Sequence, residues 1–504
     1  MSIDDNHDNH CDASLKKDSI AKKSPISFLD KYKETLFLGI DPTPTVVAIM
    51  IIYFVEGALG LSSLARTFLL KDELHLGPAE LSALTGIFAL PWTIKPLYGF
   101  ISDGIPLWGY KRRSYLVLCG MVGSLSYDAV ALNVGGNALA TTTGSLLLAS
   151  ACIAFSDVVA DGMVVEQTKK SADPNVAGGL QSLCWGSAAA GALFSAYFSG
   201  SLLEIMTPRQ IFGLTAILPF IVTLIALTID EEKVETAASP PLAQVQDLWS
   251  AIKEPAIYKP ALFLFLWQST PTSDGAFLYF MTNDLGMGPE FLGRVRLVSS
   301  LAGLVGVWVY QRYLRTVPIQ TILLWSSVLS TPLGLTSLLL ITHANRALGI
   351  PDGAFVLGDD VVLAILGQVA FLPTLVLAAK LCPPGVEAVL FATLMSVFNT
   401  ASTLGTEVGA LLTKALGVTG DNFDNLGLLT IICNVSSLYP LVFIGWLDGV
   451  GSQSEEEMEE AVAAVALMVE QQQPQHESLE PPLVAFETIP KPTTVTGGDC
   501  SDEQ

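Results

Sequence analysis

The feature that most constrains this chain is a series of apolar blocks divided by short polar connectors. A helix rises about 1.5 Å per residue, so about 20 apolar residues cross the ~30 Å hydrocarbon core of a bilayer. Lipid offers no hydrogen-bond partner to a backbone, so each block must be helical. The blocks cover residues 44–66, 78–102, 114–134, 140–166, 174–203, 208–229, 257–283, 288–312, 319–342, 354–381, 385–416 and 422–447. The sequence therefore predicts an all-α membrane protein with 12 transmembrane helices.

The composition excludes several classes of protein. Charged residues make up 15% of the chain, against about 25% in soluble proteins. The net charge of −22 includes a strongly acidic C-terminal tail, and no basic face for nucleic acid is visible. The sequence shows no nucleophile–base pair, phosphate loop, CxxC pair or histidine cluster at a recognisable spacing. We therefore expect neither an enzyme nor a protein with a metal or cofactor.

The blocks divide into two groups of six around a long polar connector, which contains a predicted amphipathic surface helix at 244–253. Lysine and arginine are more frequent in connectors that follow even-numbered blocks, which predicts cytoplasmic termini. No secretory signal or transit peptide is visible, so we expect the cell (inner or plasma) membrane rather than a plastid envelope. The predicted units are an N-terminal segment 1–40, a six-helix half 41–230, the connector 231–256, a second half 257–450 and a disordered acidic tail 451–504.

The connector between the second and third blocks has a specific pattern. Gly99 stands four residues before Asp103, and Gly109 precedes Arg112 and Arg113. This resembles the loop pattern of the major facilitator superfamily, which implies two six-helix halves and a charge lock between Asp103 and Arg112. The alternative is that the basic residues only set the topology. A similar stretch without the aspartate, Tyr310–Arg315, follows the eighth block.

The chain also resembles a narrower group, the folate-biopterin transporter family, over about residues 40–450. The matching pieces are Glu56–Gly57, Gly60–Ala65, Lys95–Arg113, Ser156–Glu166, Trp267–Pro271, Phe291–Val295 and Leu381–Glu387. The resemblance implies a secondary carrier of folates and pterins that works by proton coupling (symport) or exchange. It also implies a small-molecule substrate, protons and lipid as partners, and we expect a monomer.

Ionisable residues inside a bilayer are costly and commonly line a pathway. Glu56, Lys95 and Asp274 lie within apolar blocks, as do Asp157 and Asp161. The last two are four residues apart, so they share one helix face, and two like charges this close favour retention of a proton. The alternative is a structural role, in which they bond Ser, Thr or Lys side chains of neighbouring helices.

The chemistry of a pterin suggests roles for these residues. Its 2-amino group and adjacent ring N–H fit one carboxylate, which we expect to be Asp161 or Asp157. The glutamate tail of folate requires a cation, and Arg294 or Lys95 is expected there. Arg294 and Arg296 are about 200° apart on a helix and cannot both face a cavity. Arg294 also has Glu290 one turn before it as an alternative partner.

Flat rings also need aromatic surfaces, although aromatic residues in membrane helices are more often packing. Asp274 follows Pro271, where we expect a break in the seventh block, and Gln268 lies just before this break. Gly186, Gly191, Gly405 and Gly409 are expected at close helix contacts. The stacking candidates are Trp92, Trp185, Trp267 and Phe280.

Two other functions stay open. One is a non-transporting scaffold or pigment-assembly protein on the same fold, and the other is a carrier of a different organic anion. The two-half layout and the absence of a filter-like loop favour a carrier over a channel.

Overall fold

A computed structural model describes residues 40, 42–132, 138–170, 174–233, 253–314, 316–381 and 387–447. Helices account for the secondary structure of these residues, which contain one isolated bridge, between Leu107 and Tyr110, and no strand. The predicted surface helix at 244–253 lies, except for its last residue, outside the described residues. So do nearly all of the predicted N-terminal segment and the whole predicted acidic tail.

The first six spans correspond to the first six apolar blocks. Proline stands at the first position of several of their helices, where no backbone donor is needed. The elements are α2 (Pro44–Ala58), α3 (Leu61–Phe68) and η1 (Leu69–Glu73) in span 1; α4 (Pro78–Thr93) and α5 (Lys95–Gly104) in span 2; α6 (Arg113–Leu132); α7 (Ala138–Lys170); α8 (Pro174–Leu203); and α9 (Pro208–Ala226).

The second six spans follow in the same way, and several of them are broken into shorter pieces. They are α11 (Pro255–Gln268), α12 (Asp274–Tyr279) and η2 (Phe280–Asp284) in span 7; α13 (Pro289–Val309) and η3 (Tyr310–Leu314); α14 (Ile319–Gly334) and α15 (Ser337–Ile341); α17 (Asp352–Lys380); α18 (Glu387–Ala415); and α19 (Leu426–Ser436) with η4 (Tyr439–Leu447). The short α16 (Ala344–Ala347) lies between spans 9 and 10. Each predicted block thus coincides with a helical span of the described chain.

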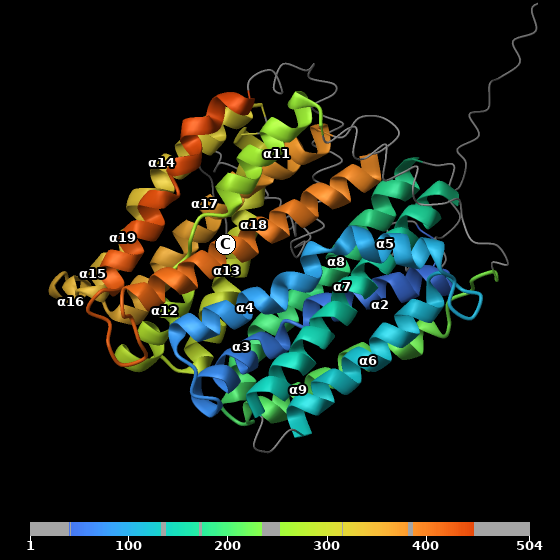
Figure 1. The fold of residues 1–504 in the computed structure, drawn as a ribbon, viewed down its shortest axis with the longest axis horizontal. Helices are drawn as coiled ribbons and strands as arrows, with labels where there is room; N and C mark the ends of the chain where they lie inside the picture. Colours follow the sequence, from blue (N-terminus) through green and yellow to red (C-terminus); the bar gives the residue numbers. More distant parts are fainter. Residues whose placement is uncertain are drawn as a thin grey trace, which may run out of the picture.

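The two halves lie side by side, and Figure 1 shows them as a blue-green and a yellow-red bundle. They meet where α4 packs against α18 and α8 packs against α13. Eight spans of the described chain are long and apolar enough to cross a membrane on composition alone. Spans 2, 5, 7 and 11 do not meet that test, and α4, α8 and α18 among them form the contact between halves. Helices that face protein need less apolar surface than helices that face lipid.

The hydrogen bonds that join the halves are concentrated away from the Asp103–Arg113 loop. We call the end of the bundle that carries this loop the lock end, and the end with the connectors 74–77 and 285–288 the opposite end. Tyr279 donates to the Leu76 carbonyl at the opposite end. Asn399 donates to the Trp92 carbonyl near the middle (3.2 Å). For the described residues, the structure is therefore closed at the opposite end.

Span 7 breaks at the predicted position. The helix stops at Gln268 and resumes at Asp274. Gly405 and Gly409 of α18 pack directly on this break, because a Cβ on either would lie 2.5 and 2.1 Å from the carbonyl oxygens of Thr270 and Thr272. The expected close contact of these two glycines is confirmed.

A second close contact joins α2 and α8 inside the first half. A Cβ on Gly191 would lie 2.1 Å from the Phe54 carbonyl oxygen, and one on Gly57 would lie 1.9 Å from that of Ala188. The expected role of Gly191 is therefore confirmed. Gly186 differs, since a Cβ there would meet nothing within 4 Å, and the expected close contact is wrong at this position.

We expect Gly191→Val to separate α2 from α8 and to lower the free energy of unfolding by about 1–3 kcal/mol, the usual cost of overpacking. The measurement is the midpoint of thermal unfolding of the purified protein in detergent. Gly144→Ala in α7 is the matched control, because its Cβ enters open space. Equal midpoints for the two variants would contradict the close crossing.

Candidate functional site

A buried ion pair forms the centre of the site. Lys95, the first residue of α5, follows a break in span 2 at Ile94, which turns its side chain toward α7. Its Nζ pairs with the Asp157 carboxylate, and the two side chains are 20% and 9% exposed. The Lys95 ammonium also lies 4.9 Å from the Trp92 ring centroid. Lys95 is therefore held by a charge and an aromatic face within an apolar bundle.

Two more acids complete this group. The Tyr53 hydroxyl, which is buried in α2, donates to Asp161 Oδ1 at 2.5 Å. One turn along α2, Glu56 lines the same pocket as Asp157, close enough for the charge of Asp157 to act on its carboxyl group. We call Tyr53, Glu56, Lys95, Asp157 and Asp161 the charge cluster. The sequence placed the two aspartates on one face of a helix, and the structure adds their partners from spans 1 and 2.

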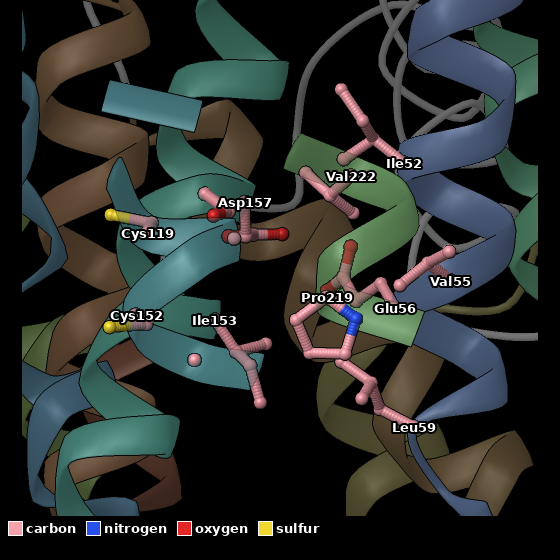
Figure 2. Close-up of a pocket in the computed structure, with 13 residues that line it drawn as sticks. Ile52, Val55, Glu56, Leu59, Cys119, Cys152, Ile153, Asp157, Pro219 and Val222 are labelled. Carbon is pink, nitrogen blue, oxygen red and sulfur yellow. The ribbon is translucent and has the colours of Figure 1, made fainter. Parts of the chain in front are cut away.

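A pocket opens beside the cluster, between α2, α6, α7 and α9. Figure 2 shows Glu56 and Asp157 on its walls from two helices, with apolar side chains around them. Asp157 is buried, whereas Asp161 keeps accessible surface. The apolar residues of the wall include Ile52, Val55, Ile153, Pro219 and Val222. An accessible carboxylate beside a charged pair can accept hydrogen bonds from a polar ligand.

The nearness of Glu56 and Asp157 has a chemical consequence. Two carboxylates close together repel each other, so the pair is more stable when one of them carries a proton. Lys95 supplies one positive charge to the group. The charge cluster can therefore hold or release a proton, and its net charge changes when it does.

The predicted Asp103–Arg112 pair is present in the loop between spans 2 and 3. Arg112 Nη2 lies 2.7 Å from Asp103 Oδ1 and 2.8 Å from Glu166 Oε1 of α7. Arg112 Nη1 donates to Ser102 Oγ (3.2 Å), and the arginine is 8% exposed. A single guanidinium thus joins the end of span 2 to the end of span 4.

Glu231 holds the same loop from the end of span 6. Its carboxylate accepts from the backbone N–H groups of Lys111, Arg112 and Arg113, at 2.7–3.2 Å. Gly109 has a φ of +86°, a backbone conformation that favours glycine. Gly99 faces Val158, and a Cβ on Gly99 would lie 3.8 Å from the Val158 side chain, which is ordinary van der Waals contact.

The second half carries its own acids. Thr336 donates to Asp359 Oδ1 at 2.5 Å. The charges of Asp359 and Asp274 both act on the neighbouring Asp360 carboxyl group. Spans 7 and 10 supply these acids, as spans 1 and 4 supply those of the charge cluster. The two halves thus repeat the placement of acids, although no lysine pairs with the second group in the described chain.

The other predicted site residues lie elsewhere. Arg294 is 67% exposed and pairs with Glu290, which was the alternative partner. Trp267 packs against the core of the second half, and Phe280 is fully buried among aromatic rings. Gln268 ends α11 beside the break, and the Trp185 side chain is outside the described set. Of the aromatic candidates, Trp92 alone is recorded in contact with the charge cluster in the described chain.

Sequence reasoning did not single out several residues that the structure brings together. Tyr53 lies three residues before Glu56, so helical spacing placed it on the same face. Asp359 and Asp360 are acids inside an apolar block, the signal that selected Asp161. Arg66 is the last residue of the first predicted block, whereas span 1 continues as far as Glu73.

Two six-helix halves, with an ion-paired cluster inside one half and a charge-paired loop between spans 2 and 3, have the layout of the major-facilitator fold. The solved structure of the nucleoside transporter NupG has the same fold, with a TM-score of 0.61 at 14% identity over 80% of this chain and 99% of that chain.

The chain belongs to the BT1 family, whose sequence profile matches residues 56–464. It is 50% identical to the folate-biopterin transporter of Synechocystis sp. over 429 residues, which are 85% of this chain and 86% of the relative. It is 32% identical to folate transporter 2 of Plasmodium falciparum, over 79% of this chain and 87% of that protein. The predicted family and fold class are confirmed, and the protein is a multi-pass membrane transporter and not an enzyme.

We expect Arg112→Gln to lower the free energy of unfolding by about 1–3 kcal/mol, because it leaves two carboxylates without their shared guanidinium. We also expect a lower transport rate, since span 2 is no longer tied to span 4. Thermal unfolding in detergent and initial uptake rates measure the two effects. Arg312→Gln, in the corresponding connector of the second half, is the control. An Arg112→Gln protein as stable and active as the control would exclude a charge lock.

Proposed function

We propose that this protein carries folates and related pterins across the membrane by alternating access, with proton movement coupled through the charge cluster. The observation that carries the proposal is the buried Lys95–Asp157 pair with Glu56, Asp161 and Tyr53 around it. The names of the relatives from Synechocystis and Plasmodium falciparum support the substrate class. We further propose that the protein works as a monomer in the cell membrane with both termini in the cytoplasm.

The geometry supports a role for Asp161 in substrate binding. It keeps accessible surface, and the Tyr53 hydroxyl fixes the position of one of its oxygens. The 2-amino group and ring N–H of a pterin form a donor pair, and a carboxylate is the acceptor that matches it. Asp157 is less suited to this role, because it is buried and paired with Lys95.

The contacts between halves support alternating access. The halves are joined at the opposite end, while the lock end is held within the first half by Arg112, Asp103 and Glu166. On the predicted topology the lock end is cytoplasmic, so the structure corresponds to an inward-facing state. Rocking of the halves would transfer the contact from one end to the other.

We expect purified protein in liposomes to accumulate labelled folic acid, and Asp161→Asn to reduce the initial rate at least about tenfold, because the amide cannot accept both pterin donors. Asp421→Asn is the control, since Asp421 is exposed in the connector between α18 and α19. Full activity of Asp161→Asn at equal protein level would remove Asp161 from the site. Absence of uptake by the unmodified protein would contradict the substrate.

We expect Glu56→Gln to separate transport from its proton coupling. The amide has the size of a protonated carboxyl group and never releases a proton, so Asp157 keeps a neutral polar neighbour in the pocket. Exchange of folic acid at equal pH should persist, and the several-fold stimulation by an inward proton gradient should be lost. Glu204→Gln, in the exposed connector between spans 5 and 6, should retain the stimulation. Gradient-stimulated uptake by Glu56→Gln would show that the proton binds elsewhere.

A further inference from the structure

Two arginines from different halves approach each other inside the bundle. Arg66 lies in α3 of span 1, and Arg296 lies in the second turn of α13 in span 8. Nη1 of Arg296 donates to Ser63 Oγ, one turn before Arg66 on the same helix face. Arg66 is three residues after Ser63 in α3, so this hydrogen bond brings Arg296 to the face of span 1 that carries Arg66, and the charge of Arg66 acts on that of Arg296.

Neither guanidinium forms an ion pair with a carboxylate of the described chain. Three other arginines within or at the ends of the described spans pair with carboxylates: Arg112 with Asp103 and Glu166, Arg209 with Glu73, and Arg294 with Glu290. Arg113 and Arg312 instead lie beside the tyrosines of their connectors. Two like charges brought together between the halves without a counter-charge are unfavourable unless an anion joins them.

The surroundings hold Arg66 in position without neutralising it. Its guanidinium lies 5.6 Å from the centroid of the Phe88 ring of α4, and the Tyr127 phenol of α6 is nearby. Arg296 keeps accessible surface even though its side chain reaches the other half. A planar guanidinium stacked on a ring presents its N–H groups in a fixed direction, which suits recognition of a carboxylate.

We propose that Arg66 and Arg296 together bind the two carboxylates of the glutamate tail of folate. This inference rests on the proposed function and specifies the part of the substrate that these residues bind. From Glu56 to Arg66 the chain advances 10 residues along span 1, about 15 Å of helix. An extended pteroyl group covers a comparable length, so a pterin at Asp161 places its tail toward the two arginines.

Binding in this position also links substrate to conformation. Arg66 belongs to the first half and Arg296 to the second, and both lie toward the opposite end, where the halves touch. Without an anion the two positive charges oppose that contact, whereas a bound dicarboxylate attracts both. A substrate with the tail therefore stabilises closure of the opposite end, and a pterin without it does not.

The test compares a pterin ligand that has the tail with one that has no carboxylate. Equilibrium binding of labelled folic acid and of biopterin, which has the pterin ring and no carboxylate, is measured on the full-length protein and on Arg66→Gln, Arg296→Gln and Arg296→Lys. Each Gln variant should weaken folic acid binding about 10- to 100-fold, the usual effect of losing a charge-assisted hydrogen bond. Biopterin binding should change less than about threefold, and Arg296→Lys should restore part of the affinity for folic acid because it keeps the charge.

Arg346→Gln is the control, because Arg346 pairs with Asp352 on the exposed connector between spans 9 and 10. Equal losses for the two ligands would show that the arginines only maintain the fold, and unchanged folic acid binding would show that the tail lies elsewhere. Either result overturns the inference while the proposed function stands. If the unmodified protein binds neither ligand, the folate proposal fails and the assignment of the tail fails with it.

Discussion

The structure depends on the need to neutralise charge inside an apolar bundle. Lys95 cannot remain ionised among membrane helices without a partner, and Asp157 supplies one from span 4. Glu56 and Asp161 then add acids that one lysine cannot balance, and the Tyr53 hydroxyl donates a hydrogen bond to Asp161. The arrival of a proton, or of a ligand with donor groups, changes the balance between the one lysine and the acids of the charge cluster. Such a response is what a coupled carrier requires.

The two halves contribute differently to this scheme. The first half carries the charge cluster and the Arg112 network, which fixes the ends of spans 2 and 4. The second half repeats the acids, in Asp274, Asp359 and Asp360, but not the paired lysine. The contact between halves is made by α4 with α18 and by α8 with α13, where Gly200 and Gly293 lie against each other. The cluster with the paired lysine thus lies within one half.

Much of this was predictable from the sequence, because span length and apolar content are set by the bilayer. The blocks, the break near Pro271 and the shared face of Asp157 and Asp161 follow from local spacing, and the Asp103–Arg112 pair was implied by the resemblance of its loop to the major-facilitator pattern. Partners from distant spans do not. Nothing local showed that Lys95 pairs with Asp157 or that Arg66 meets Arg296. Arg294 matched the family pattern, yet helix rotation turns it outward to Glu290 and turns Arg296 toward span 1.

The central claim is that the protein encloses a folate between its halves and carries it across the membrane. Counterflow tests this most directly: liposomes that contain the protein are loaded with unlabelled folic acid and diluted into a trace of labelled folic acid at equal pH. The account predicts a transient accumulation of label above equilibrium, because an alternating carrier exchanges substrate one molecule at a time. Label that never exceeds the level in protein-free liposomes would contradict the account and favour a scaffold role on the same fold.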